Sequence, residues 1–500
     1  MARIVVIGAG MGAMAAAARL AVAGHRVTVY ERAETYGGGV GRFERDGFVF
    51  DTGPGLLHLP AVYRDLFVKT GKEPLESLVG LEQVDPASRH LFADGTTVTL
   101  PNASRAGVGA ALDTALGAGT GERWADFMGR ARDAWDRSRR PLLEEPLRPD
   151  WQVLGRDPYP AVRQRRLLRV RQAATLAGVG TLELRDARLA ALLEWYALGY
   201  GLDPRRAPAG AALLAYLEQT FGSWYVRGGL RELARAVYER CLARKVEFVF
   251  GAEVSRVAEK DGRAAGVELA GGTVAEADHV VDGTGPDGLP GRPPYREGEV
   301  APRPDPRTGR FTVLLALRGA RPPGTPHRTV VHSAGGAGSA EAAEPEAGAV
   351  FGGGTAAHPT VTVLRPDDPA TRPDEAHEAV TLTATVAAPG PAGGPDWTDP
   401  ALRERYAELL VGAAGAAVDG LGERLLWREV RTPAETGPVP APALAGAGGR
   451  FLRPANTTRL PGLYAVGGWA HPGGGLAHAG MSGALVAGLI VEGADFRGSR

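Results

Sequence analysis

The N-terminal region contains a glycine-rich stretch whose residue types and spacing suit phosphate binding, Gly8-Ala9-Gly10-Met11-Gly12-Ala13. Gly8 permits a tight turn, Gly10 lets the backbone approach a pyrophosphate, and Ala13 allows a helix to pack closely on a strand. The N–H groups and positive dipole end of that helix then face the phosphates. Glu31 suits a carboxylate that accepts the hydroxyls of an adenosine ribose, and it disfavours a 2′-phosphate. The pattern predicts a dinucleotide site.

The elements that must position this loop are a strand, a helix and a second strand. Residues Ile4 to Ile7 are apolar and β-branched, which predicts a buried parallel strand. Met11 to Ala23 predicts a helix, and Val27 to Tyr30 predicts the next strand. The order strand, helix, strand is the opening of an α/β fold with a parallel sheet.

A second glycine pattern, Gly283-Thr284-Gly285-Pro286-Asp287-Gly288, follows a strand-like segment that ends near Val281. Pro286 and the proline-rich residues after it cannot continue as a helix. We therefore interpret this segment as a strand end that enters a loop. A second nucleotide site for a nicotinamide is not expected.

The bulk composition excludes several classes of protein. The chain has 500 residues, a formal net charge of zero and one cysteine, Cys241. A neutral chain has no cationic excess for nucleic acid, and a single cysteine excludes an internal disulfide or a cysteine-based metal cluster. The apolar run Leu476 to Val491 is short for a membrane span and carries His478. We expect a cytoplasmic protein with no metal site and at most peripheral membrane contact.

The central part of the chain changes in character. Residues 123–139 and 160–177 predict arginine-rich helices, and 231–244 predicts a third helix before a strand at 246–250. Strand patterns recur at 254–257 and 266–269, with Asp261-Gly262 at the tip of a hairpin. Further strands are predicted at 311–317, 329–332, 361–364 and 379–386, and a helix at 401–421.

Several motifs along the chain resemble the phytoene desaturase-like family of FAD enzymes, which is related to the amine oxidases. They are Gly37-Gly38-Gly39-Val40-Gly41-Arg42, Asp46-Gly47-Phe48-Val49-Phe50-Asp51-Thr52-Gly53-Pro54, Gly201-Leu202-Asp203-Pro204, Trp224-Tyr225-Val226-Arg227-Gly228-Gly229-Leu230, and the stretch from Arg453 to Gly475. The resemblance implies an α/β, two-dinucleotide-binding-domain (Rossmann-like) fold with a discontinuous α+β substrate domain, and FAD held non-covalently. The implied FAD-binding domain comprises 1–75, 222–288 and 430–500. The implied substrate-binding domain comprises 76–221 and 289–429.

The resemblance also implies roles for individual residues. Arg42 would contact the flavin phosphates, although Gly39 stands where the family usually has a basic residue. The backbone at Val254 would meet the adenine, and Gly467 and Gly468 would let the chain pass close to the flavin. The helix after Gly475 would direct its N-terminus at the flavin, where negative charge accumulates on reduction. The full predicted cofactor-binding set is Gly8, Gly10, Gly12, Ala13, Glu31, Arg32, Gly38, Gly39, Arg42, Pro54, Gly55, Val254, Gly283, Gly467, Gly468, Gly475 and Leu476.

Three histidines are candidates for the proton-accepting group. His58 follows the Asp51-to-Pro54 loop, and His471 and His478 flank the C-terminal glycine run. Near neutral pH a histidine can take a proton while a hydride leaves to the flavin. The alternative for each is a ring that is hydrogen-bonded structurally, which weighs most for His471. Trp469 supplies half of an aromatic cage.

The resemblance implies an FAD-dependent dehydrogenase that introduces a C=C bond into an apolar or polyene substrate, as in carotenoid biosynthesis, with oxygen or a quinone as acceptor. A second hypothesis is an FAD oxidase that acts on a smaller natural-product intermediate or an amine. A third is a non-catalytic prenyl-binding escort protein on the same fold, which would be expected to lose the flavin motifs retained here.

Overall fold

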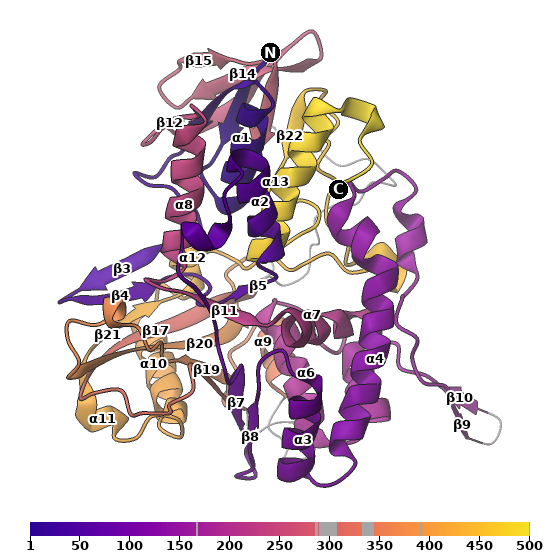
Figure 1. The fold of residues 1–500 in the computed structure, drawn as a ribbon, viewed down its shortest axis with the longest axis vertical. Helices are drawn as coiled ribbons and strands as arrows, with labels where there is room; N and C mark the ends of the chain where they lie inside the picture. Colours follow the sequence, from indigo (N-terminus) through magenta and orange to yellow (C-terminus); the bar gives the residue numbers. More distant parts are fainter. Residues whose placement is uncertain (167–168, 286–288, 290–307, 333–344, 391–392, 500) are drawn as a thin grey trace.

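The computed structural model describes residues 1–166, 169–285, 289, 308–332, 345–390 and 393–499 (Figure 1). The second glycine pattern lies partly outside these residues, since only Gly283 to Gly285 are described. The N-terminus lies at the tip of the molecule above β14 (Figure 1).

A five-stranded parallel sheet forms the N-terminal lobe. Its order is β12 (Glu247–Val249), β2 (Arg26–Tyr30), β1 (Arg3–Ile7), β16 (His279–Asp282) and β22 (Leu463–Ala465). The central strand β1 pairs in parallel with β2 and with β16, which places Ile7 opposite Tyr30 and Asp282. The carboxyl ends of these strands therefore meet at one edge, where α/β sheets bind ligands.

Helices and a small antiparallel sheet cover the two faces of the parallel sheet. The helices are α1 (Met11–Val22), α8 (Leu230–Ala243), α13 (Leu476–Val491) and α2 (Ala61–Gly71). The small sheet comprises β13 (Val254–Lys260), β14 (Arg263–Leu269) and β15 (Val274–Glu276). Its hairpin turns at Asp261 and Gly262, whose φ angles of 52° and 72° match the turn expected from the sequence.

Helices α1 and α13 of this lobe pack backbone to backbone. A Cβ atom added at Gly483 of α13 would lie 2.5 Å from the carbonyl oxygen of Gly12 in α1. The small residues of α1, nearly all buried, permit this approach. The apolar run that ends the chain is therefore a core helix.

A seven-stranded mixed sheet forms the second lobe (Figure 1). Its order is β21 (Leu425–Arg431), β17 (Thr308–Arg318), β20 (His377–Ala387), β19 (Val361–Leu364), β18 (Arg328–Val331), β7 (Ser88–Leu91) and β8 (Thr97–Leu100). Only β18 and β7 pair in parallel among its neighbours. One face packs on α10 (Pro400–Ala414) through a core that includes Phe311 and Trp397.

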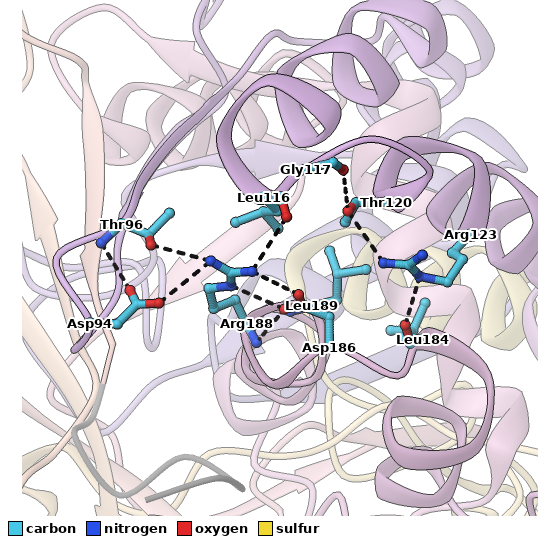
Figure 2. Close-up of polar contacts among 10 residues, drawn as sticks. All are labelled: Asp94, Thr96, Leu116, Gly117, Thr120, Arg123, Leu184, Asp186, Arg188 and Leu189. Carbon is cyan, nitrogen blue, oxygen red and sulfur yellow. Dashed lines mark hydrogen bonds and ion pairs between the residues drawn. The ribbon is translucent and has the colours of Figure 1, made fainter.

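Helices complete the second lobe around a large apolar core. They are α3 (Arg105–Leu116), α4 (Thr120–Arg139), α5 (Leu176–Val179), α6 (Ala187–Gly199) and α7 (Leu213–Phe221). Further short elements are β3 (Arg42–Arg45), β4 (Phe48–Asp51), α9 (Glu346–Phe351), α11 (Leu421–Arg424) and α12 (Pro433–Thr436). Arg188 and Arg123 link the segments of this helical layer by hydrogen bonds (Figure 2).

Arg188, in the first turn of α6, bridges three segments. Its Nη1 donates to Thr96 Oγ1 at 3.3 Å, its Nη2 donates to the Leu116 carbonyl at 3.4 Å, and its Nη2 lies 2.9 Å from the carboxylate of Asp186 (Figure 2). Asp186 also caps α6 by accepting backbone N–H groups. Arg123 of α4 makes a second link through the Leu184 carbonyl at 3.1 Å (Figure 2). These contacts satisfy carbonyls that helix ends leave unpaired.

A three-stranded antiparallel sheet joins the two lobes. Its strands are β5 (Leu57–His58), β11 (Ser223–Val226) and β6 (Leu81–Gln83), with His58 opposite Ser223. The chain thus crosses between lobes through paired strands. The residue limits of the two domains stay a prediction.

The α/β fold class is confirmed, but the helix predicted over 160–177 is wrong. That segment contains an antiparallel hairpin of β9 (Gln164–Arg166) and β10 (Arg169–Arg171), followed by α5. The hairpin extends away from the body of the protein (Figure 1). Its arginines leave no apolar stripe, and without one a helix gains no stability from packing.

The helix predicted over 401–421 is too long. α10 ends at Ala414, and Gly415 is its C-terminal cap. Glycine in a helix costs about 1 kcal/mol relative to alanine, so Gly412 and Gly415 favour an early end. Within the described part of the chain, no helix combines the length and the apolar character needed to cross a membrane.

The α1–α13 contact predicts the effect of a single methyl group. Gly483→Ala should lower the free energy of unfolding by about 1–3 kcal/mol, because the new Cβ meets backbone atoms that cannot move aside. Gly412→Ala is the matched control, since no atom lies within 4 Å of its added Cβ, and it should stabilise by about 0.5–1 kcal/mol. Chemical denaturation of both variants tests this, and equal midpoints would contradict it.

Candidate active site

The glycine-rich loop after β1 turns sharply at Gly8, whose φ is +88°. The Ala9 N–H donates a 2.6 Å hydrogen bond to the Glu31 carboxylate, which also accepts from the Ala33 N–H at 2.9 Å. Glu31 follows β2, so the acid lies beside the loop at the carboxyl edge of the sheet. Each carboxylate oxygen can accept more than one hydrogen bond, so the acid can still receive ribose hydroxyls.

The start of α1 is closely packed at Gly12 and open at Gly10. A Cβ added at Gly12 would lie 2.9 Å from Gly467 Cα and 2.8 Å from the Ala479 carbonyl oxygen, whereas one added at Gly10 would meet nothing within 4 Å. Gly10 also caps α1 without a side-chain hydrogen bond. The buried side of the loop is therefore closed, and the side on which phosphates would bind is open. These residues fit the pyrophosphate and adenosine of FAD.

A second glycine loop lies against the first. Gly37 and Gly10 form an isolated parallel bridge, and a Cβ added at Gly38 would lie 3.1 Å from Gly10 Cα. Arg231 holds this loop by donating to the carbonyls of Tyr36 and Val40, and its guanidinium stacks 4.0 Å from the centre of the Tyr36 ring. Gly38 is thus brought to the dinucleotide loop, and the exposed Gly39 follows it.

The other residues predicted to contact FAD from the N-terminal side lie at separate places in the fold. Arg42 begins β3, where its Nε lies 2.6 Å from a Glu44 oxygen and its Nη1 lies 3.7 Å from Glu232. Val254 is buried at the start of β13 in the same apolar cluster as Ile7. Arg32 is exposed beside Glu31, and Pro54 and Gly55 precede β5. Their contacts with FAD stay predictions.

The C-terminal loop returns to the same edge of the sheet. Gly467 has a φ of +96° and donates its N–H to Ser482 Oγ at 3.0 Å. A Cβ added at Gly468 would lie 2.6 Å from Pro440. Trp469 packs on the other glycine segment, because its ring lies 2.8 Å from where a Cβ at Gly285 would be. Gly283 likewise packs tightly, since a Cβ there would lie 2.9 Å from the Ile7 carbonyl oxygen.

Helix α13 begins beside these glycines. Its cap is Gly475, with a φ of +102° and no side-chain hydrogen bond to the first turn. Tyr63 of α2 fixes the entry to the helix by donating to the Leu476 carbonyl at 2.9 Å. Tyr200 lies 3.5 Å from where a Cβ at Gly475 would be. The N-terminus of α13 is thus oriented by both lobes.

The ring of His471 has a structural environment. It is completely buried, and its Nε2 donates to the Glu145 carbonyl at 3.0 Å. Its backbone is held as well, because its N–H donates to Pro454 and its carbonyl accepts from Asn456. Burial lowers the pKa of His471 to about 4, which keeps the ring neutral near pH 7. A structural role accounts for these contacts, while the buried Nδ1 of His471 has no hydrogen-bond partner among the described residues.

His478 lies in the first turn of α13 and is also buried. Burial lowers its pKa to about 4. Its Nδ1 lies 3.4 Å from where a Cβ at Gly475 would be. The ring therefore packs against the cap of the helix.

His58 differs from both, because a carboxylate faces it. Its Nε2 lies 3.5 Å from Glu218 Oε2, and its buried Nδ1 has no hydrogen-bond partner among the described residues. Burial lowers the pKa of His58, Glu218 opposes that effect, and Arg328 adds to it. A neutral imidazole with one free lone pair can accept a proton.

Sequence reasoning missed Glu218, Arg328 and Tyr200. Glu218 interrupts an apolar helix, and Arg328 opens a strand of Thr and Val residues. A charge inside an apolar run is the signal that would have drawn attention to both, because buried charges are rare unless paired. Tyr200 carries no comparable signal.

Comparison with known proteins places the chain in a family and a fold. The family described as flavin-containing amine oxidoreductase matches residues 14–325. The chain is 30% identical to a hydroxyneurosporene desaturase of Cereibacter sphaeroides over 98% of this chain and 97% of that protein. It is 29% identical to a 4,4'-diapolycopene oxygenase of a Methylomonas species over 98% of each. Its fold resembles a putrescine oxidase redesigned in cofactor binding, with a TM-score of 0.62, 16% identity, and 98% of this chain and 99% of that chain covered.

The ribose-binding interpretation of Glu31 predicts a loss of cofactor affinity. Glu31→Gln should weaken FAD binding roughly 10–100-fold, because a charge-assisted hydrogen bond contributes about 1.5–3 kcal/mol. Equilibrium titration of the flavin-depleted protein with FAD measures this. Glu259→Gln, on an exposed position of β13, is the control and should bind FAD as the unsubstituted protein does. Equal affinity in the Glu31 variant would remove this residue from the site.

The buried histidines predict a pH dependence of stability. The folded pKa of about 4 for His471 lies below the ordinary histidine pKa of 6.5, so the unfolded chain binds more protons between these two values. The free energy of unfolding should fall below pH 6.5 by up to about 1.4 kcal/mol per pH unit for this histidine. His471→Gln should reduce that slope, with the exposed His358→Gln as control. Denaturation midpoints across this pH range that keep the same slope would contradict the assignment.

Proposed function

The chain belongs to the flavin-containing amine oxidoreductase family and is an FAD-dependent oxidoreductase, and we propose that it introduces a C=C bond into an apolar polyene. The two full-length relatives named above are a desaturase of hydroxyneurosporene and an oxygenase of diapolycopene, which supports a polyene as substrate class. One observation carries the proposal. At Gly12 the glycine-rich loop after β1 meets both Gly467 of the C-terminal loop and Ala479 in the first turn of α13, which suits a cofactor held between them.

We propose that FAD binds without a covalent link. Glu31 would receive the ribose hydroxyls, and the open side at Gly10 would admit the pyrophosphate. Gly38 and Gly39 would extend that cradle, and Arg42 would reach the phosphates from the start of β3. The single cysteine, Cys241, is buried and donates to the Met14 carbonyl, so it is not available for a covalent attachment.

When bound, FAD supplies a hydride acceptor at N5. The task of the protein is then to hold the substrate beside it and to remove a proton from the neighbouring carbon. We propose that His58 accepts this proton at Nδ1, because that nitrogen is buried, neutral and free of a partner among the described residues. The electron pair of the broken C–H bond becomes the second bond of the C=C unit.

The substrate would lie along the helical layer of the second lobe. Its core contains the aromatic and aliphatic side chains of α4, α6 and α7. An apolar polyene dissolves in lipid, so we propose that a protein of the cytoplasm takes its substrate from a membrane surface through peripheral contact. Oxygen or a quinone would then reoxidise the flavin.

The first test is anaerobic reduction of the holoprotein. The purified protein should show the two-banded spectrum of oxidised flavin, and the visible band should bleach on addition of phytoene in detergent micelles. His58→Gln should bind FAD equally and bleach roughly 10²–10⁴-fold more slowly, the range for loss of a general base. Bleaching by a small polar amine but not by a polyene would replace the proposed substrate class. A protein that takes up no FAD would overturn the enzyme assignment.

A further inference from the structure

A buried ion pair lies beside His58. Glu218 of α7 is 7% exposed, Arg328 of β18 is 4% exposed, and their side chains are in contact. Taking two charges out of water costs several kcal/mol per ion, and well-packed apolar replacements are often as stable or more stable. Stability alone therefore does not account for this pair.

The surrounding contacts orient the pair toward the histidine. Arg328 donates its Nε to the Ala87 carbonyl at 3.1 Å and lies over the Trp195 ring at 5.0 Å. Its Nη2 also lies 3.4 Å from Ser223 Oγ. With the guanidinium fixed in this way, the second carboxylate oxygen of Glu218 lies 3.5 Å from His58 Nε2.

We infer that Glu218, anchored by Arg328, is a positioning residue that accepts the Nε2–H of His58 and so leaves the Nδ1 lone pair free for the substrate proton. This inference rests on the proposed function, because it assigns a purpose to the same proton acceptor. It adds two residues that act through His58 and do not themselves contact the reacting atoms.

The tautomer follows from the arrangement of acceptors. A neutral imidazole carries one N–H and one lone pair, and a carboxylate that faces one nitrogen favours the hydrogen there. Glu218 faces Nε2, and among the described residues no well-aligned hydrogen bond reaches Nδ1, although the Gly222 carbonyl lies near enough to the ring to favour its protonated form. Burial alone would raise the pKa of Glu218, but Arg328 and His58 together lower it, so the carboxylate is ionised.

The charged and titratable groups around this centre come from three elements. Glu218 of α7 and Arg328 of β18 face His58, and the Gly222 carbonyl also favours the protonated ring. Tyr196 and Tyr200 face Glu218 from the α6 side, and burial raises the pKa of both. The charge of Glu218 raises the pKa of His58 and the charge of Arg328 lowers it, so the two members of the ion pair act on the ring in opposite directions.

The strand pairing fixes the histidine from the other side. His58 lies opposite Ser223 in the β5–β11 pair, and Ser223 in turn lies beside Arg328. β5 contacts α13, whose first turn is also held by Tyr63. The group that accepts the proton is thus placed against the helix expected to face the flavin, by contacts from both lobes.

The proposed reaction removes one proton and one hydride from neighbouring carbons. One C–H bond of the substrate breaks and its proton joins His58 Nδ1, while its electron pair forms the new π bond. The neighbouring carbon loses hydrogen with its electron pair to FAD, which is the two-electron oxidant. The imidazolium then faces Glu218 until it returns its proton to solvent.

Glu218→Gln tests the inference because it keeps the shape and removes the charge. In stopped-flow bleaching of the holoprotein by phytoene, the limiting rate should fall roughly 10–100-fold while the half-saturating phytoene concentration changes less than about threefold. Nitrogen NMR of the full chain labelled with ¹⁵N-histidine supplies a readout that does not depend on activity. The His58 signals, assigned with His58→Gln, should show the Nε2–H tautomer in the unsubstituted protein and a mixture in Glu218→Gln.

Two controls separate positioning from general destabilisation. Glu183→Gln removes another buried carboxylate, 2.9 Å from Arg130 Nε, and should leave the bleaching rate and the His58 tautomer unchanged. In a His58→Gln background, Glu218→Gln should have no further effect on the rate, because both residues act through one ring. Additive losses would overturn the inference.

The tautomer measurement also stands apart from the proposed function. If no polyene bleaches the unsubstituted protein, the proposed function fails, while the NMR result still decides whether Glu218 sets the His58 tautomer. An Nδ1–H tautomer in the unsubstituted protein would falsify the positioning role. So would a His58 tautomer that is the same in Glu218→Gln as in the unsubstituted protein.

Discussion

Close backbone packing between the first and last helices of the N-terminal lobe sets the geometry of the candidate site. Gly12 and Gly483 let α1 and α13 approach until added methyl groups would overlap backbone atoms. The same Gly12 touches Gly467, which precedes α13. These contacts at Gly12 therefore fix the glycine-rich loop after β1 relative to α13, the two elements proposed to hold opposite ends of the cofactor. Protein interiors are too densely packed for such a contact to relax without loss of stability.

The second constraint is the junction between the lobes. The small sheet of β5, β11 and β6 and the ion pair of Glu218 with Arg328 both lie there. Burying two charges between apolar layers costs desolvation free energy, and strand pairing alone would join the lobes without that cost. Because the pair lies beside His58, we attribute to it a chemical role, which is to orient Nε2 of the neutral imidazole.

The three histidines show how environment separates residues of identical type. All three are neutral near pH 7 because burial lowers the pKa of each. His471 uses its Nε2 to hold a backbone carbonyl, and His478 packs on a helix cap. His58 alone of the three faces a carboxylate within the described structure. The distinction lies in long-range contacts, such as the pairing of residue 58 with residue 223.

The local order of residues was enough to predict the glycine-rich turn between the first strand and the first helix, and the acid that follows the second strand. Gly8, Gly10 and Glu31 belong to one short strand, helix and strand unit, whose geometry depends on neighbours in the chain. The same holds for the hairpin at Asp261 and Gly262, since a two-residue turn is specified by its own residue types. The resemblance to a known family extended this to the fold class and the reaction type.

Tertiary structure alone decided the rest. The segment at 160–177 forms a hairpin, and nothing in its local pattern of arginines indicates a register. Glu218 and Arg328 are separated by more than a hundred residues, and they meet only because β18 and α7 pack at the same junction. Sequence periodicity reports which face of an element is buried, but it does not report which distant element covers that face. The sequence alone therefore did not indicate that Glu218 faces His58.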